Sequence, residues 1–339
     1  MTKLARRIDL NLKYENKDIS ADVSSYLEGI DFTDNASGES DDFQISLHDR
    51  EELWSADWFP SKGAKIQVDL IAKNWIPNKE EINYPLGKLE IDQIDSDGKP
   101  EKVKIKALSV FVSGSIREER SQGWESISIK GIAKEIANRH GMPLFYDSDY
   151  NPILERKDQN EESDLSFLMG ICKDAGLALK ITDGKIVIFD EESYENKPPI
   201  IIIEKKQVEK YSFSSKITDV YKCAKLTYQE GKKAKKITAE YTAKDVEGTA
   251  KTLKINQKVS STTEAERVVR KKLREKNKAQ NTAKLTLQWN CDIAAGVCVE
   301  LKGFNKMNGI YFIDKVSHSI RTSGGSKMSL ELHKRLEGY

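Results

Sequence analysis

The chain has few of the residues that build disulfide frameworks, metal clusters or membrane spans. Its 339 residues include four cysteines and four histidines, with no CxxC pair and no HExxH motif. No apolar run approaches the roughly 20 residues of a membrane-spanning helix, and the basic start MTKLARRIDLNLKYENKDIS has no apolar stretch typical of a secretory signal. We therefore expect ordinary buried thiols in a reducing compartment, no metal site and no membrane insertion.

Charge is abundant but unevenly distributed. Charged residues make up 32% of the chain and hydrophobic ones 38%, as in a folded protein with a polar surface. The formal net charge is +1, yet residues 1–200 carry 26 basic and 39 acidic side chains, whereas residues 201–285 carry 22 basic and 10 acidic ones. Such asymmetry favours charge-complementary contacts between subunits or with partners.

Alternating apolar and polar residues predict β-strands at both ends of the chain. ARRIDLNLKYE, DFQISLHD and AKIQVDLIAK alternate with period two, and two further strands flank the turn SDGKP. Many short, closely spaced strands are typical of a barrel or sandwich, so residues 1–115 are predicted to form a small β-barrel. Strands return in KYSFSSKI, VYKCAKLTYQE and GVCVELKGF, which predicts a second barrel from residues 206–230 and 284–339.

The middle of the chain changes period. ESISIKGIAKEIANRHGM and DLSFLMGICKDAGLAL each place apolar residues on one helical face and end at a glycine. The strands LALKIT and KIVIFD follow, so residues 116–205 are predicted to form an α+β domain. Residues 231–283 are predicted to be an insertion with a hairpin and the basic helix TTEAERVVRKKLREKNKAQ, capped by Thr262 or Thr263.

The two ends of the chain contain similar blocks. FPSKGAKIQVDLIAK, YPLGKLEIDQIDSDG and EKVKIKAL recur, in order, as DIAAGVCVELKGF, MNGIYFIDKVSHSI and GGSKMSLEL. Strand–turn–strand patterns look alike in many β proteins, but three ordered elements with glycines at matching strand starts favour an internal repeat. The matched positions are Gly63 with Gly296, Gly87 with Gly309, and Asp92 with Asp314.

The predicted fold class is mainly β with α+β: two similar small β-barrels that flank, and are interleaved with, an α+β middle region. Closed rings of identical chains are the common symmetric assemblies. Three copies of a chain with two similar lobes would present six nearly equivalent lobes. Such a ring can contact a six-fold object on one side and a three-fold object on the other.

These stretches, in this order, resemble the baseplate hub family of contractile tails, which includes the phage late control gene D proteins and the N-terminal hub module of the VgrG/Pvc8 proteins. KGAKIQVDL followed by PLGKLEIDQIDSDGKP resembles the family's first barrel, and IAKEIANRHGM resembles its helix ending in His-Gly. DQNEESDLSFLMGICKDAGLALKITDGKIVIFD resembles its most typical segment, and AAGVCVELKGF with GIYFIDKVSHSI resembles its second barrel. Residues 230–285 match least well.

The resemblance implies a structural baseplate hub protein, not an enzyme, of a contractile phage tail or phage-tail-like particle. A homotrimer with two tube-type barrels per subunit would form a pseudo-six-fold ring that joins the hexameric tail tube protein to a trimeric spike protein. Baseplate wedge proteins are further expected partners, no cofactor is expected, and the insertion is expected to pack on the middle domain outside the ring. Assembly is expected in the bacterial cytoplasm, and the spike is expected to be a separate protein.

Four carboxylates in DQNEESDLSFL have two interpretations. They are Asp158, Glu161, Glu162 and Asp164. A pair of catalytic acids, as in a glycosidase, is one interpretation, and stabilisation of a helix start capped by Asn160 or Ser163 is the other. We favour capping, because the chain has no clear catalytic signature such as GxSxG, Walker A or GxGxxG. Asp314 and His318 also resemble an acid–base pair, but Ser96 stands opposite His318 in the repeat, which favours shared strand geometry.

The basic segment 232–278 also has more than one interpretation. Its lysine-rich KKAKK (Lys232–Lys236) and basic helix suit a nucleic acid, and a tail-associated cell-wall hydrolase is a further alternative for the chain. No aromatic residues are interleaved with the helix lysines, so a nucleic acid is not expected as a specific ligand. We favour a contact between the helix and an acidic surface of a neighbouring subunit, made by Arg267, Arg270, Lys271 and Arg274.

Overall fold

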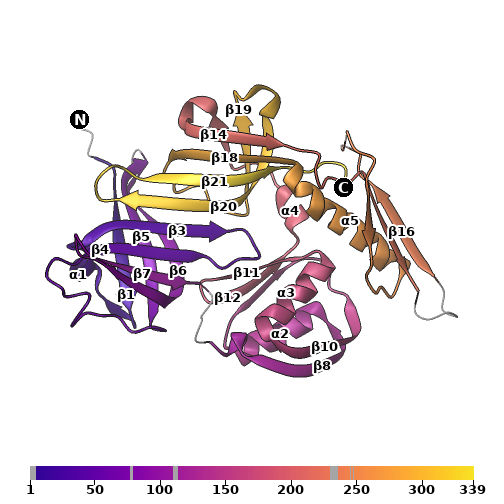
Figure 1. Cartoon of the computed structure of the whole chain (residues 1–339), viewed down its shortest axis with the longest axis horizontal. Helices are drawn as coiled ribbons and strands as arrows, with labels where there is room; N and C mark the ends of the chain where they lie inside the picture. Colours follow the sequence, from indigo (N-terminus) through magenta and orange to yellow (C-terminus); the bar gives the residue numbers. More distant parts are fainter. Residues whose placement is uncertain (1–4, 77–78, 110–113, 230–235, 245, 247) are drawn as a thin grey trace.

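The computed structural model describes residues 5–76, 79–109, 114–229, 236–244, 246 and 248–339. Within these residues the fold is mainly β: one 13-stranded sheet runs through two lobes, and three smaller sheets belong to the other parts (Figure 1). Four parts are distinguished below by their residues. They are the first lobe (7–108), the middle domain (115–195), the insertion (220–277) and the second lobe (201–215 with 281–334).

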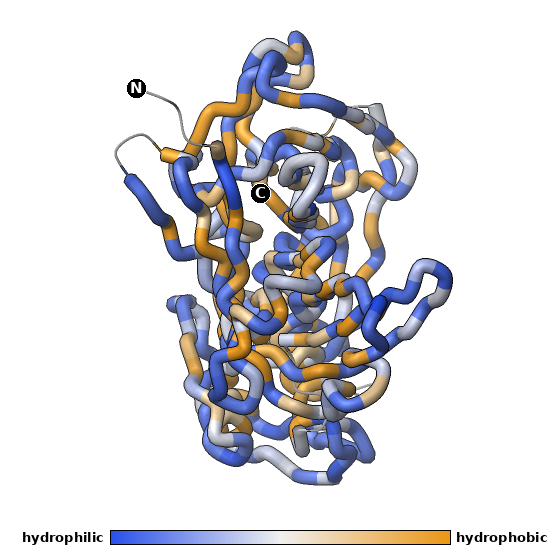
Figure 2. The backbone as a smooth tube through the Cα atoms, turned by 90° about the vertical axis from the view of Figure 1, so that its left-hand side faces the viewer, coloured by the Kyte–Doolittle hydropathy of each residue, from blue (hydrophilic) through white to orange (hydrophobic). Residues whose placement is uncertain are grey.

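The first lobe consists of β-strands around an apolar core. Alternate residues of β4 and β7 are buried, including Phe43, Ile45 and Leu47, as the period-two pattern predicts. Figure 2 shows hydrophobic and hydrophilic residues following one another along the strands. Its elements are β1 (Arg7–Tyr14), β2 (Lys17–Asp18), α1 (Ser20–Ser24), β3 (Leu27–Asn35), β4 (Asp42–His48), β5 (Lys65–Ile76), β6 (Lys79–Asp97) and β7 (Lys102–Leu108).

The middle domain packs two helices against short strands. Ser128 caps α2 and Ser163 caps α3 through their hydroxyls. The second helix begins at Asp164, as its pattern predicts, whereas α2 begins later than its apolar pattern suggests and Ile127 lies in a strand. Gly176 ends α3 in the left-handed conformation. The elements are η1 (Ser115–Arg117), β8 (Glu119–Ser128), α2 (Ile129–Arg139), β9 (Leu144–Asp147), β10 (Ile153–Ser163), α3 (Asp164–Ala175), β11 (Ala178–Thr182), β12 (Lys185–Phe189) and α4 (Glu191–Glu195).

The insertion has its own sheet, which packs against the basic helix α5. The prediction that residues 206–230 stay together in the second barrel is corrected here: β14 pairs with β18, whereas β15 pairs with β16 and β17 and shares a core with α5. Ser261, not a threonine, caps α5. Residues 230–235, which hold most of KKAKK, lie outside the described residues. The elements are β15 (Cys223–Tyr228), β16 (Ile237–Thr242), β17 (Thr252–Ile255) and α5 (Thr262–Asn277).

The second lobe completes the main sheet. Its core includes the fully buried side chains of Tyr311, Ile313 and Val316 from its longest strand. The elements are β13 (Ile201–Glu204), η2 (Lys205–Gln207), β14 (Val208–Ser215), β18 (Asn281–Gln288), β19 (Cys298–Lys302), η4 (Asn305–Met307), β20 (Gly309–Arg321) and β21 (Lys327–Lys334), and η3 (Lys278–Gln280) connects α5 to β18.

The two lobes have the same strand order. Neighbouring strands in the first lobe are β3-β4-β7-β6-β5-β1, and in the second lobe β14-β18-β21-β20-β19-β13. Along the chain, β1, β3, β4, β5, β6 and β7 correspond in sequence to β13, β14, β18, β19, β20 and β21. One pair differs in direction, because β1 is antiparallel to β5 whereas β13 is parallel to β19.

The expectation of two closed barrels is corrected by the way the lobes join. The outer edge of β3 pairs with the second half of β20, from Gly29 opposite Arg321 to Asn35 opposite Lys315, and is therefore not available to pair with β1. The first half of β20 pairs with β19 on the same side. Among the described strands, no pairing closes either lobe, and the lobes share one continuous sheet (Figure 1).

Candidate functional site

The matched glycines make the same contact in both lobes. The Gly63 N–H donates to the carbonyl of Ile91 at 2.8 Å, and the Gly296 N–H donates to the carbonyl of Ile313 at 2.9 Å. Both glycines have a left-handed backbone, with φ of +81° and +84°, which disfavours a side chain. Each therefore turns the chain into the strand that follows it, β5 in the first lobe and β19 in the second.

The matched aspartates lie at matching irregularities of the sheet. The β6–β7 register shifts between Ile91 and Gln93, around Asp92, and the β20–β21 register shifts around Asp314. A bulge of this kind bends a strand and increases its twist. Because the bend occurs at corresponding residues, β6 and β20 curve at the same point of their lobes.

A further pair of matching irregularities in the two lobes has no shared sequence motif. The β3–β4 register shifts between Leu27 and Gly29, and the β14–β18 register shifts between Val208 and Lys210. A glutamate occupies each shift and pairs with a lysine of the last strand of its lobe. The two pairs are Glu28 with Lys102 at 2.6 Å and Glu209 with Lys327 at 2.5 Å.

The third matched pair of glycines differs in its surroundings. Gly87 and Gly309 both have positive φ, +86° and +138°. A Cβ on Gly87 would lie 2.9 Å from the Cβ of Asp183, in the β11–β12 turn of the middle domain, whereas a Cβ on Gly309 would lie 3.2 Å from the flexible Lys334 side chain. The first lobe therefore uses its glycine for close docking of the middle domain, and the second lobe does not.

A guanidinium stabilises the pairing of residues 29–35 of β3 with residues 315–321 of β20, here called the seam. Arg321 donates two hydrogen bonds to the Asp31 carboxylate, at 2.8 and 3.0 Å, and one to the carbonyl of Ile30. A Cβ on Gly29 would lie 2.9 Å from the Arg321 side chain, so a glycine leaves the space that this side chain fills.

Beneath the seam, an indole and an imidazole are buried together. The Trp289 Nε1–H donates to His318 Nδ1 at 2.9 Å, and both side chains are fully buried. Burial disfavours the charged imidazolium and lowers the pKa of His318 to about 4, although the negative charge of Asp34 opposes this shift. His318 is therefore neutral near pH 7, and Asp314 and His318 do not form the acid–base pair that their spacing resembles.

One largely buried lysine lies where three parts of the chain meet. Lys180 of β11 in the middle domain pairs with Asp34 at 2.5 Å and with Asp41 at 3.1 Å, both in the first lobe. The same Asp34 carboxylate accepts the backbone N–H of Ala295 in the second lobe at 2.7 Å. Burial raises the pKa of Asp41 to about 6 despite the nearby lysine. The junction fixes the middle domain against both lobes.

The acidic helix α4 and the basic helix α5 form a dense set of ion pairs. Asp190 caps α4, and its carboxylate also binds Lys271 at 2.7 Å and Arg267 at 3.3 Å. Although burial opposes it, these cations hold the pKa of Asp190 below its usual value. The remaining pairs are Arg270–Glu192 and Lys271–Glu192, both at 2.7 Å, with Arg274–Glu195 and Lys278–Glu191.

The four basic residues singled out in the sequence therefore have partners within their own chain. Lys271 and Arg274 are 8% and 4% exposed, which removes them from the surface that a neighbouring subunit contacts. The expected acidic partner of this helix is corrected accordingly: it is α4 of the same chain. The excess charges of the two chain segments partly neutralise each other at this contact, here called the α4–α5 clasp.

A buried histidine extends the clasp to the second lobe. His333 Nδ1–H donates to the Asp314 carboxylate at 2.8 Å, and Nε2–H donates to Glu195 at 3.1 Å. Burial opposes the charged imidazolium, but the two carboxylates raise the pKa of His333 to about 9. Glu195 is held to a pKa of about 2, against burial, by His333 and Arg274. Asp314 thus serves the clasp, whereas its counterpart Asp92 is exposed.

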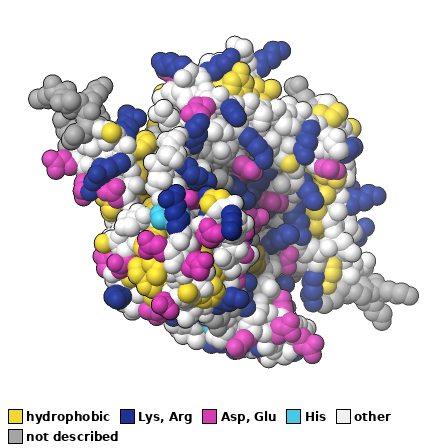
Figure 3. Space-filling view, turned by 60° about the vertical axis from the view of Figure 1, so that its left-hand side comes forward, with side chains coloured by type: hydrophobic (Ala, Val, Ile, Leu, Met, Phe, Trp, Pro, Cys, Tyr) yellow, Lys and Arg dark blue, Asp and Glu magenta, His cyan; other side chains and the backbone are white. Residues whose placement is uncertain are grey.

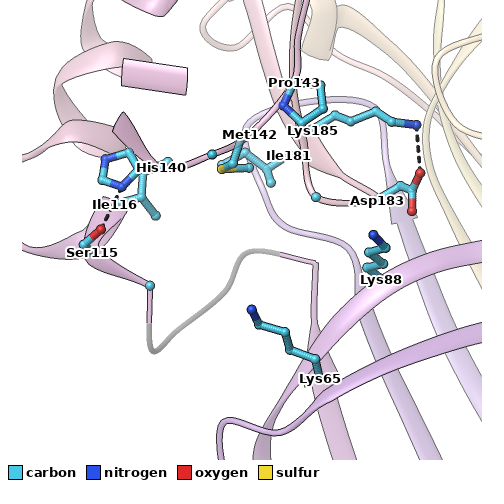
Figure 4. A pocket seen from close by; sticks show the side chains of 13 residues that line it. Lys65, Lys88, Ser115, Ile116, His140, Met142, Pro143, Ile181, Asp183 and Lys185 are labelled. Atoms are coloured by element: carbon cyan, nitrogen blue, oxygen red, sulfur yellow. Dashed lines mark hydrogen bonds and ion pairs between the residues drawn. The ribbon is translucent and has the colours of Figure 1, made fainter. Parts of the chain in front are cut away.

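A cleft of about 520 Å³ lies between the first lobe and the middle domain, lined on one side by Lys65 and Lys88 and on the other by Ser115 and His140 (Figure 4). The Ser115 hydroxyl and His140 Nδ1 are 2.8 Å apart, and His140 Nε2 lies 2.7 Å from the Asp164 carboxylate.

Asp164 is fully buried and has other donors besides the histidine. Arg139 donates to both of its oxygens, at 2.9 and 2.7 Å, and Gln159 donates at 3.0 Å. Burial opposes ionisation, but these hydrogen bonds hold the pKa of Asp164 below its usual value. The carboxylate therefore ties η1, α2, β10 and α3 together. Of the four carboxylates in this segment, the other three lie in β10, so they do not cap α3.

The described residues contain no group of three histidine, cysteine or acidic side chains placed to hold a metal ion. All four cysteines are free thiols, and three are buried. None of the helices within the described ranges has the length and apolarity that crossing a bilayer requires. On the face shown in Figure 3, acidic and basic side chains are interspersed.

Comparison with known proteins gives three kinds of likeness. Residues 173–333 match the model of the family described as YQBQ-like. A probable baseplate hub protein of Escherichia phage P2 is 27% identical over 180 residues, which are 53% of this chain and 44% of the relative. The chain therefore aligns with less than half of that relative's length.

Solved structures share the whole fold at low sequence identity. A tail protein from Neisseria meningitidis MC58 superposes with a TM-score of 0.74 and 11% identity, covering 97% of both chains. The Escherichia coli c3393 protein, a component of the type VI secretion system with structural similarity to the T4 tail proteins gp27 and gp5, has a TM-score of 0.58 and 10% identity over 100% of this chain and 77% of its own. The resemblance to baseplate hub and tail proteins is confirmed.

The clasp predicts a large effect of removing Arg274. Arg274→Ala would leave the buried Glu195 without its guanidinium, and removing one partner of a buried ion pair costs about 3–5 kcal/mol. Lys276→Ala, on an exposed position of the same helix, is the matched control and should change little. Denaturant unfolding of both variants measures the difference, and equal stabilities would contradict a clasp that holds α5.

His333 predicts a loss of stability at alkaline pH. Its pKa is raised from 6.5 to about 9 on folding, so its contribution is complete below pH 6.5 and is lost as the pH rises through 9. The free energy of unfolding should fall in this window by an amount on the order of a few kcal/mol. His333→Gln should abolish that slope and His48→Gln should keep it. His318 titrates below pH 6.5, so it does not contribute here. A wild-type protein with constant stability from pH 6.5 to 9 would refute this account.

Proposed function

We propose that the chain is a structural baseplate hub protein of a contractile phage tail or a phage-tail-like particle, without enzymatic activity. Its likeness to the phage P2 relative, and the tail-protein fold shared by its structural neighbours, support this role. In the proposed assembly three chains form a ring of six similar lobes. The proposed ring is built in the bacterial cytoplasm and becomes part of the virion tail or of a released particle.

The observation that carries this proposal is the repeated lobe. Six strands recur in the same order, with the same bulges and the same Glu–Lys pair, and the two copies are joined edge to edge through β3 and β20. We interpret the matched glycines and aspartates as traces of one duplicated unit. A chain with two such units gives a three-fold ring a local six-fold character, which a simple trimer lacks.

The partners follow from this symmetry. A hexameric tail tube protein would contact the six lobes on one face of the ring, one tube subunit to each lobe. A trimeric spike protein would contact the other face, one spike chain to each hub chain, and baseplate wedge proteins would bind outside. The middle domain and insertion are held to the lobes by the Lys180 junction and the clasp, so we place them outside the ring.

The alternative functions lack a specific supporting observation. A glycosidase needs two convergent carboxylates, but the described lining of the cleft contains one, Asp183, and it pairs with Lys185 at 2.8 Å. A nucleic-acid surface on α5 would need free basic side chains, yet its main cations bind α4.

The mass of the purified protein in solution tests the hub proposal. Analytical ultracentrifugation should give three chains per particle, alone or after addition of a hexameric tail tube protein, with six tube subunits bound per three hub chains. The tube protein premixed with an unrelated trimer is the control. A hub protein that stays monomeric and does not bind the tube protein would overturn the proposal.

A further inference from the structure

Among the described strands, the two edges that correspond to the two sides of the β3–β20 seam have no paired strand within the chain. In the first lobe the outer edge of β3 pairs with the second half of β20. The counterpart of β3 is β14, which pairs with β18 on one side only. The counterpart of the second half of β20 is Gln93–Asp97 of β6, which pairs with β7 on one side only, because β5 ends its pairing at Glu90. Each chain therefore presents two open strand edges, β14 and the second half of β6, which correspond to the two strands that pair in the seam.

We propose that β14 of one chain pairs, antiparallel, with the second half of β6 of a neighbouring copy, reproducing between chains the β3–β20 seam that joins the lobes within a chain. The occupant of each free edge is a second copy of this chain. The inference rests on the proposed ring and goes beyond it, because it names the strands and the register of the interface.

The register follows from the matched ladders. Phe32 of β3 stands opposite Phe43 of β4, and Phe213 of β14 stands opposite Ala283 of β18. From these residues both ladders continue in the same register to the next strand, β7 in the first lobe and β21 in the second. Phe213 therefore occupies the position of Phe32, and β14 corresponds to β3 residue by residue. Gln93 corresponds to Lys315, since each follows its bulge. Thr33 lies opposite Ser317 within the chain. The equivalent pairs between chains are Ser215 with Ile94, Ser214 with Asp95, Phe213 with Ser96, and Ser212 with Asp97.

The exposure of the two edges fits a contact made only on assembly. Six of the eight residues of β14 are exposed, among them Tyr211, which is 48% exposed. An open edge of this length invites pairing with another chain, and natural proteins usually cover or blunt such edges. Neither β14 nor Gln93–Asp97 carries a proline that would block a ladder.

The charges along the two edges are complementary. Lys210 lies on the exposed part of β14 and Lys216 directly follows the strand, whereas Asp95 and Asp97 lie on the facing segment of β6. In the derived register each lysine lies diagonally across from one aspartate, a distance that a lysine side chain can span. Both aspartates already contact lysines of β7, at 3.3 and 2.8 Å, and remain partly exposed.

Such a contact closes into a ring. One seam within each chain and one between chains alternate, so every lobe has the same two neighbours in the same geometry. A contact of this head-to-tail kind continues until rotation brings the first chain back to the last. Six lobes from three chains satisfy the proposed hub symmetry, with three seams of each kind.

Paired cysteines test the register directly. Ser214→Cys with Asp95→Cys should form disulfides between chains, giving dimers and trimers but no larger species on a denaturing gel, and reduction should return the monomer. Directly opposite residues of neighbouring strands are within disulfide range. Thr33→Cys with Ser317→Cys is the internal control: it occupies the equivalent seam within the chain and should cross-link without a change in mass.

Two outcomes separate this inference from the hub proposal. If the protein is a trimer by mass and the internal control closes, but the Ser214–Asp95 pair stays reduced, the seam is wrong and the hub proposal stands. If the protein is monomeric, the hub proposal fails as well. A displaced pair, Ser212→Cys with Gln93→Cys, should remain uncross-linked, and cross-linking as efficient as that of the Ser214–Asp95 pair would overturn the register.

Discussion

The pairing of β3 with β20 is the contact on which the rest of the molecule depends. It occupies the edge that β3 would need to close the first lobe into a barrel, and so converts two small β units into one continuous sheet. Arg321 reinforces it through Asp31, and the buried Trp289–His318 contact lies beneath it. Because the two lobes match strand for strand, the seam also identifies the corresponding edges that stay unpaired among the described strands of the chain. These are β14 and the second half of β6, and each is the kind of edge that can pair with the other.

Two sets of polar contacts hold the other parts of the chain against this sheet. Lys180 binds the middle domain to Asp34 of the first lobe, and Asp34 in turn accepts a hydrogen bond from the second lobe. The α4–α5 clasp binds the insertion to the segment that leads into the second lobe. The clasp also pairs part of the excess charge of the two chain segments, since four carboxylates of the first segment bind five cations of the second inside one subunit. The basic side chains of α5 that looked available for a neighbour are thus used within the chain.

The sequence indicated the two lobes through a few positions where the backbone conformation or a bulge restricts the type of residue. Gly63 and Gly296 stand out because their backbone is left-handed, and Asp92 and Asp314 because they follow the same alternating pattern into a bulge. Alternation cannot tell which strand lies beside the outer edge of β3, so the open sheet could not be foreseen. The Glu28–Lys102 and Glu209–Lys327 pairs are separated by more than 70 residues and share no motif, and only the structure reveals their equivalence. The partner of α5 was missed for the same reason: ion pairs between distant segments leave no periodic signal.

The central claim is that one duplicated unit, joined edge to edge, continues from chain to chain into a closed ring. Electron cryomicroscopy of the assembled protein viewed along the ring axis tests it most directly. The account predicts a three-fold particle with six similar lobes evenly spaced around a central opening, linked by alternating seams of like geometry. A particle with three separate pairs of lobes, or an open chain of subunits, would contradict it.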